Sequence, residues 1–163
     1  MIKSLIIAAI TALLPLAAGA QASGNAYTQS DPADAAFMDM AVEMAQMAVE
    51  QGDAPGGTAI ILNGAFHAVG HGATPELDAL RNAHSASLAN AAVYTVNEPT
   101  TEAWVEMSKR GVSQIYYANP REDVIEAGIY RVSDYDDSAI PADVTLTSKK
   151  ELAHSGAAAL IER

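Results

Sequence analysis

Residues 92–118, AVYTVNEPTTEAWVEMSKRGVSQIYYA, decide the fold, because they predict a strand, a helix and a second strand in direct succession. Mostly apolar and aromatic residues fill 92–96 and again 114–118, a pattern typical of buried strands. Between them, residues 100–109 have the apolar spacing of a helix, which ends at Gly111. A helix of this length between two strands favours parallel pairing through a right-handed crossover. The stretch therefore predicts an α/β fold.

The rest of the chain adds helices and strands on both sides of this unit. In chain order, we expect a helix from Asp31-Pro32 to Gly52, a hairpin over 57–70, a helix over 74–90, a short helix over 120–127, a strand at 143–147 and an alanine-rich helix near the end. The hairpin turns at Asn63-Gly64, a dipeptide that suits the positive φ angles of a type I′ turn. Because the hairpin is antiparallel, the expected architecture is a three-layer α-β-α sandwich with a mixed central sheet.

The first 22 residues predict a secretory signal peptide. Lys3 precedes an apolar run from Leu5 to about Ala18, and Ala20-Gln21-Ala22 is a small-x-small cleavage pattern. The run is short for a membrane span and has no basic flank behind it, so we expect no membrane anchor after cleavage. The mature protein is thus expected to be periplasmic or secreted, with residues 23–30 as a flexible arm.

Charge and cysteine content exclude several classes of partner and site. The chain has 20 acidic and nine basic side chains, and removal of the signal peptide leaves 20 against eight, a net charge of about −12. Such a protein repels a polyanion, so we expect no nucleic-acid partner. It contains no cysteine, which excludes disulfides and any zinc site built on thiolates.

Two segments at predicted helix starts carry a family resemblance: TPELDALRNA at 74–83 and EPTTEAWVEMSKRGVSQIYYANPRED at 98–123. Both follow strands or their loops, where ligands usually bind in open α/β sheets. They resemble the cytidine deaminase-like superfamily, and most of all the bacterial guanine deaminases and tRNA adenosine deaminases, which carry H-A-E and P-C-x-x-C at these helix starts. The resemblance covers about residues 33–150, and the tail GIYRVSDYDDSAIPADVTLT resembles an extension of guanine deaminases.

The resemblance implies a zinc-dependent hydrolytic deaminase, but the zinc ligands are missing. The family's histidine ligand falls on Thr74, and its two cysteine ligands fall on Thr100 and Ala103. Glu76 matches the glutamate that shuttles protons, and Gly72 stands at the position of the asparagine that holds the base. We therefore expect no metal and no cofactor, and a vestigial pocket.

Loss of the metal removes the means of activating water. Bound zinc lowers the pKa of water from about 15.7 to about 7, which a single carboxylate cannot do. Threonine is a good N-cap, so Thr74 and Thr100 are expected to cap the helices that once carried ligands. The family also implies a homodimer, with a deaminase-like domain over 31–130 and an extension over 131–163 that packs on the domain or on the dimer partner.

Three functions remain open on these grounds. We favour an exported, catalytically degenerate protein that binds a small molecule or a protein partner through the inherited cleft or the dimer surface. The first alternative is an active hydrolase or deaminase with altered chemistry that uses Glu76. The second alternative is a structural or assembly protein.

Glu76 and Trp104 each admit a structural interpretation as well as a functional one. For Glu76 we favour a surface glutamate that interacts with the helix dipole over a residual proton shuttle. Trp104 either lines the vestigial pocket or packs in the core, and we favour the core.

Three further groups could suggest a metal site, and for each we favour an interpretation without metal. The groups are His67 and His71, the acidic residues Asp134, Asp136 and Asp137, and the methionines Met40, Met44 and Met47. The two histidines would lie about 13 Å apart along a strand, too far to bind one ion. The acidic run lacks the glycine and final glutamate of a calcium loop, and the methionines have the spacing of core residues on a helix.

Overall fold

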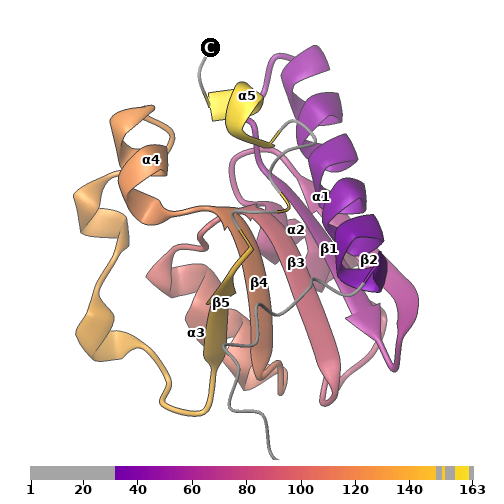
Figure 1. Ribbon diagram of the computed structural model, residues 1–163. Helices are drawn as coiled ribbons and strands as arrows, with labels where there is room; N and C mark the ends of the chain where they lie inside the picture. Colours follow the sequence, from indigo (N-terminus) through magenta and orange to yellow (C-terminus); the bar gives the residue numbers. More distant parts are fainter. Residues whose placement is uncertain (1–31, 150–151, 153–156, 162–163) are drawn as a thin grey trace, which may run out of the picture.

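The computed structural model describes residues 32–149, 152 and 157–161 (Figure 1). The predicted signal peptide and arm lie outside the described residues. Within the described ranges, no helix combines the length and the apolar character that crossing a membrane requires.

The centre of the molecule is a five-stranded mixed sheet in the order β2-β1-β3-β4-β5 (Figure 1). The strands are β1 (Gly57–Leu62), β2 (Ala65–His71), β3 (Ala91–Asn97), β4 (Gln114–Asn119) and β5 (Thr145–Ser148). β1 is antiparallel to both of its neighbours, whereas β3, β4 and β5 run parallel. The predicted strand, helix and parallel strand are confirmed, with Val93 beside Ile115 in the register.

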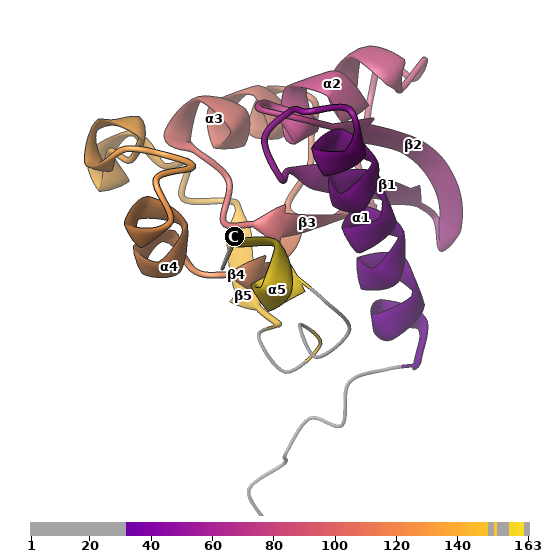
Figure 2. The same ribbon diagram turned by 90° about the horizontal axis from the view of Figure 1, so that it is seen from above.

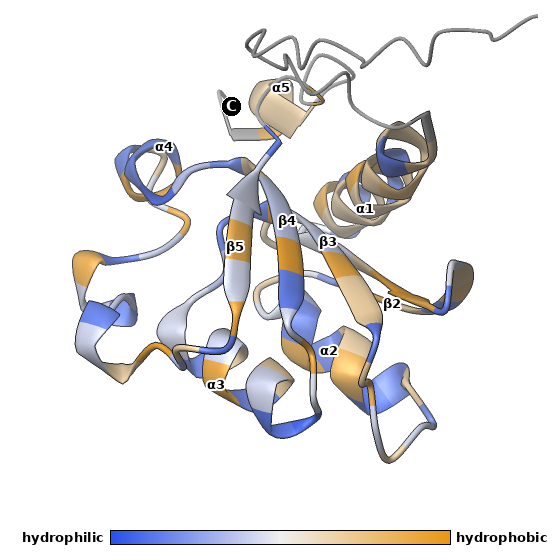
Figure 3. Ribbon diagram, turned by 60° about the horizontal axis from the view of Figure 1, so that its bottom comes forward, coloured by the Kyte–Doolittle hydropathy of each residue, from blue (hydrophilic) through white to orange (hydrophobic). Residues whose placement is uncertain are grey.

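Helices cover both faces of the sheet, so the expected α/β sandwich with a mixed sheet is confirmed (Figure 2). The helices are α1 (Pro32–Glu50), α2 (Pro75–Asn82), α3 (Thr101–Lys109), α4 (Arg121–Glu126) and α5 (Ala157–Ile161), with two 3-10 turns, η1 (Val132–Asp134) and η2 (Asp137–Ala139). One core cluster joins α2 and α3 to one face of the sheet, and a second joins α1 and α5 to the other. Figure 3 shows hydrophobic residues along the strands between these layers.

The buried face of α1 differs in part from the expectation, since Met38 and several alanines are fully buried, whereas the predicted Met40, Met44 and Met47 are not. Ala41, Ala45 and Ala48 are fully buried, whereas Met47 is 39% exposed. A Cβ on Gly57 would overlap the backbone of Ala41, so helix and strand are in direct contact there. Only small side chains fit such an approach, and the predicted methionines therefore flank the contact, with Met40 and Met44 half-buried.

α2 ends at Asn82, well before the expected end at residue 90. The guanidinium of Arg110 explains the difference, because it donates to the carbonyl oxygens of Leu80, Ala83 and Ser85. The backbone N–H of Leu88 in turn donates to the carbonyl of Arg110, over 2.7 Å. These contacts from α3 hold the segment after α2 in an irregular path into β3.

Candidate functional site

Six polar side chains are buried in the described part of the chain, and they gather at one edge of the sheet. We call this group the polar edge; it consists of Thr58, Glu76, Thr95, Asn97, Glu98 and Asn119. β1 begins there, β3 and β4 end there, and α2, α3 and α4 begin beside it. The carboxyl ends of parallel strands are the usual ligand site of open α/β sheets.

Glu76 is a buried residue, so the favoured interpretation as a surface glutamate is wrong. Its side chain is 2% exposed, and its Oε1 accepts a hydrogen bond from the Thr95 hydroxyl over 2.6 Å. Thr95 in turn accepts from the Thr58 hydroxyl over 3.0 Å. The cause of the burial is the close approach of α2 to β2, because a Cβ on Gly70 would overlap the carbonyl oxygen of Pro75.

The environment of Glu76 favours its protonated form. Burial raises the pKa of its carboxyl, and this effect outweighs the lowering of the pKa by hydrogen bonds from the Thr95 hydroxyl, its own backbone N–H and the Thr58 hydroxyl. Glu76 therefore holds its proton to a higher pH than glutamic acid in water does.

An asparagine ends each of the two central parallel strands. Asn119 Nδ2 donates to Asn97 Oδ1 over 3.1 Å and also lies 3.1 Å from the carbonyl oxygen of Ala157 in α5. Asn97 Nδ2 donates to the carbonyl oxygen of Pro55, in the loop between α1 and β1, over 3.1 Å. The two amides thus connect that loop, the strand ends and α5.

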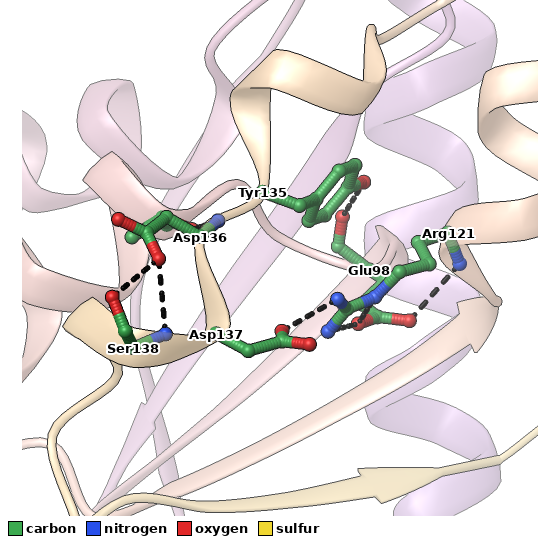
Figure 4. Close-up of polar contacts among 7 residues, drawn as sticks. Glu98, Arg121, Tyr135, Asp136, Asp137 and Ser138 are labelled. Carbon is green, nitrogen blue, oxygen red and sulfur yellow. Dashed lines mark hydrogen bonds and ion pairs between the residues drawn. The ribbon is translucent and has the colours of Figure 1, made fainter.

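Glu98 and Arg121 form a buried ion pair beside these amides (Figure 4). Glu98 accepts from Arg121 Nε over 2.7 Å and from the Arg121 backbone N–H over 2.9 Å. Arg121 also donates to Asp137 over 2.7 Å, and its guanidinium lies 4.9 Å from the centre of the Tyr135 ring. The Tyr135 hydroxyl donates to the backbone carbonyl of Glu98 over 3.0 Å.

Two tyrosines from the segment after α4 reach the polar edge. The rings of Tyr130 and Tyr135 meet edge to face at 6.4 Å. Burial is the largest cause of a raised pKa of the Tyr130 hydroxyl, and the charge of Glu76 raises this pKa further. Tyr130 thus meets the polar edge through Tyr135, whose hydroxyl donates to the Glu98 carbonyl.

The two threonines predicted as caps differ from each other. Thr100 caps α3, since its hydroxyl accepts from the backbone N–H of Ala103 over 3.3 Å, as predicted. Thr74 has ψ of 62°, outside the extended region of N-caps, and its side chain makes no capping bond. The cap prediction for Thr74 is wrong, and α2 begins with Pro75, which has no N–H to satisfy.

The other predicted site residues divide between the core and the edge. Ala103 and Trp104 are buried in the cluster between the sheet and the helices α2 and α3, which is the favoured interpretation of Trp104. Gly72 has φ of 88°, and a Cβ there would overlap the carboxylate of Asp53. Asp53, from the loop after α1, thus takes the space that a side chain at position 72 would occupy.

The residues at the three inherited ligand positions do not fit zinc. Zinc in proteins binds thiolate, imidazole and carboxylate groups, whereas Thr74, Thr100 and Ala103 offer two hydroxyls and a methyl group. Nowhere among the described residues do three histidines, cysteines or acids lie close enough together to hold a metal. Asp134 and Asp136 instead accept hydrogen bonds from backbone N–H groups of their own turns.

The two histidines of β2 are not members of the polar edge, although His71 pairs with Gly57, directly before Thr58. His67 is the extra residue where the register of β1 and β2 shifts, and His71 ends the strand. Each has one buried ring nitrogen without a hydrogen-bond partner, Nε2 of His67 and Nδ1 of His71. The expected separation of these rings stays a prediction.

An open groove of about 250 Å³ lies between α2 and α3. Its lining residues are Leu77, Leu80, Arg81, Glu106 and Arg110. None of them belongs to the polar edge, so this groove is separate from the inherited site.

Most of the polar edge was missed by sequence reasoning, which found Glu76 alone. The missed members are Thr58, Thr95, Asn97, Glu98 and Asn119, and the neighbouring Arg121, Tyr130 and Tyr135 were missed as well. One signal was present in the sequence. Both parallel strands end on an asparagine, and the next two residues are a proline and a charged residue, in the order Asn97-Glu98-Pro99 in one strand and Asn119-Pro120-Arg121 in the other. Equivalent positions on neighbouring parallel strands lie side by side.

Comparison with known proteins supports the fold assignment. No family model and no curated protein matches the chain. Solved structures do match. The guanine deaminase of Nitrosomonas europaea is 18% identical, with a TM-score of 0.63 over 78% of this chain and 82% of its own. That of Bacillus subtilis is 24% identical, with a TM-score of 0.56 over 75% and 90%. A tRNA deaminase that edits adenosine to inosine at the wobble position is 22% identical, with a TM-score of 0.59 over 77% and 98%. The chain thus shares its fold with these guanine and tRNA deaminases, the enzymes that the sequence resembles.

Proposed function

We propose that the chain is an exported, catalytically degenerate protein with a deaminase fold, which binds a small molecule or a protein partner through the inherited cleft or the dimer surface. The observation that carries the proposal is the donor set at the start of α2 and α3. Thr74, Thr100 and Ala103 supply no zinc ligand, and the Thr100 hydroxyl is already engaged by the backbone of its own helix.

The state of Glu76 supports the same conclusion. Its carboxyl is buried, and its pKa is raised above the ordinary value by burial. A general base must be ionised and must reach the proton it removes, whereas this group is bonded inside the core to Thr95. One carboxyl without a nucleophile or a second base is not a catalytic constellation.

A direct test measures metal content and deamination on the mature protein, expressed with its signal peptide in zinc-supplemented medium. Guanine is the first substrate to assay, because a structural neighbour has been crystallised with 8-azaguanine and another with 2,6-diaminopurine. We expect no stoichiometric zinc by mass spectrometry under native conditions and no release of ammonia. One zinc per chain together with ammonia release would establish the alternative, an active deaminase with altered chemistry.

Binding experiments distinguish whether the chain binds a small molecule or a protein partner. Calorimetric titration of guanine and 8-azaguanine tests the cleft, and pull-down from the export compartment tests protein partners. We expect a homodimer in sedimentation analysis, no binding of nucleic acid by this acidic chain, and no membrane fraction after signal cleavage. Fractionation of cells that express the chain with and without residues 1–22 tests the export.

The closed state of the polar edge favours one second candidate, a structural or assembly role. Glu76, Glu98 and Asn97 all have partners within the protein, and no more than 4% of any of them is exposed. A site whose polar groups are satisfied internally does not need a ligand for stability. Failure of every small molecule to bind, together with a stable assembly, would favour this candidate.

A further inference from the structure

The segment between α4 and β5 contains a self-contained unit, residues 131–139, which we call the strap. It includes both 3-10 turns, and no residue in it is buried. The backbone N–H of Arg131 donates to the Asp134 carboxylate over 2.7 Å, and the backbone N–H of Ser138 donates to the Asp136 carboxylate over 3.0 Å. Each of the two turns is therefore held by a hydrogen bond within the strap itself.

The strap lies over the ion pair of Glu98 and Arg121 (Figure 4). Tyr135 and Asp137 approach this pair from outside, while Glu98 itself is only 4% exposed. Tyr130, directly before the strap, is buried and its ring contacts the Tyr135 ring, and Ile140, directly after the strap, packs against the core. The two ends of the strap are thus anchored, and its middle covers the polar edge.

Three polar contacts among the described residues fasten the strap to the rest of the protein, namely the Tyr135 hydroxyl to the Glu98 carbonyl, the Asp136 backbone N–H to the Thr101 hydroxyl over 2.7 Å, and the ion pair of Arg121 with Asp137. The Tyr135 ring also contacts the Arg121 guanidinium and the Tyr130 ring. The Asp137 side chain is 74% exposed, so its ion pair is screened by water and contributes little to stability. These contacts hold the middle of the strap less strongly than the packing of Tyr130 and Ile140 holds its two ends.

We propose that the strap is a lid over the polar edge, latched by the ion pair between Arg121 and Asp137, and that it opens while the sheet stays folded. Opening removes Tyr135 and Asp137 from above Glu98 and gives solvent access to its carboxylate. The lid thereby controls the access of a ligand to the polar edge. That role rests on the proposed function, whereas the motion itself is measured without any ligand.

The test compares Asp137→Asn with Asp143→Asn, an exposed acid outside the strap. Each protein is treated with a carbodiimide and glycine ethyl ester, and labelling of Glu98 is followed by peptide mass spectrometry. The latch predicts that Asp137→Asn raises the rate of Glu98 labelling by about 1.4-fold to fivefold, the ratio that corresponds to a surface ion pair. Asp143→Asn leaves the rate unchanged. Salt at about 0.5 M raises the rate in the native chain and not in Asp137→Asn, since the latch is ionic.

Hydrogen exchange distinguishes a moving lid from general loosening. We expect faster exchange at Tyr135 and Asp136 in Asp137→Asn, with the amides of β3 unchanged. Tyr135→Phe, which removes the hydroxyl bond to Glu98, is expected to act in the same direction. Equal Glu98 labelling in Asp137→Asn and Asp143→Asn would overturn the proposal, and so would exchange that rises equally in β3. Neither result bears on zinc content or deamination, so failure of the lid and failure of the proposed function are separate outcomes.

Discussion

The Thr95 hydroxyl donates a hydrogen bond to the carboxyl of Glu76 over 2.6 Å, in a part of the molecule from which water is excluded. This contact joins the middle of the sheet to the first turn of α2. It accounts for the presence of an acid in the core, since a buried carboxyl needs a hydrogen-bond partner.

Replacement of Glu76 by glutamine is expected to change how stability depends on pH. The pKa of Glu76 is raised in the folded state, so the folded protein binds the proton more tightly than the unfolded chain. Its contribution is fully present below the unfolded pKa of about 4.5 and is lost as pH rises through the folded value. Glu76→Gln stays neutral, and its free energy of unfolding relative to the native chain should therefore increase as pH rises from 4.5. Urea unfolding at several pH values measures this, with the exposed Glu102→Gln as control; parallel curves would contradict it.

The two inherited threonines form a matched pair for a stability test. Thr100→Ala removes a capping bond and should lower the free energy of unfolding by about 1 kcal/mol. Thr74→Ala removes no such bond and should change it by less than about 0.5 kcal/mol. Chemical denaturation of both variants decides the matter. Equal losses would mean that Thr74 caps α2 in solution.

A methyl group at position 70 should separate α2 from β2. The Cβ of Gly70→Ala would overlap backbone atoms of Pro75 and Ala79, which cannot move independently. We expect a loss of about 1–3 kcal/mol, as for other overpacked cores. Ala65→Gly, on the exposed end of the same strand, should cost only about 0.5–1 kcal/mol. If Gly70→Ala is no worse than Ala65→Gly by thermal unfolding, the close approach of the helix is refuted.

Restoration of the inherited ligands tests whether the backbone still places them together. The triple variant Thr74→His, Thr100→Cys and Ala103→Cys should bind one zinc ion per chain, because the starts of α2 and α3 both lie beside the polar edge. Titration against a chromophoric chelator measures the stoichiometry, and Thr100→Cys with Ala103→Cys alone is the control. Zinc uptake by the control equal to that of the triple variant, or none by either, would show that position 74 has left the site.

The sequence predicted correctly those helices and strands whose bounds are set by residues close to them in the chain. The unit of β3, α3 and β4 was recovered because apolar spacing and a stop at Gly111 mark it within 27 residues. The end of α2 was not recovered, because Arg110, far along the chain, holds the carbonyls that follow Leu80. The spacing of apolar residues in the sequence does not reveal a long-range contact made by a single side chain.

The candidate site shows the same division. Glu76 and the two helix starts came from a motif, but the burial of Glu76 depends on a glycine in another element that lets α2 approach the sheet. Its partner Thr95 looks like any strand threonine in sequence. The ion pair of Glu98 and Arg121 required knowledge that β3 and β4 are neighbours in register.

Hydrogen bonds of Asn97 and Asn119 connect α5 with the loop between α1 and β1. Asn119 contacts the carbonyl of Ala157, and through Asn97 the same chain of bonds continues to Pro55. Deletion of α5 would therefore leave a donor unsatisfied in the interior, at a cost of about 1–3 kcal/mol. For anyone who shortens the chain or fuses a tag to it, Ala157 and Leu160 of α5 belong to the core of the protein, and a reporter peptide is safer on the exposed turn at Asn63-Gly64.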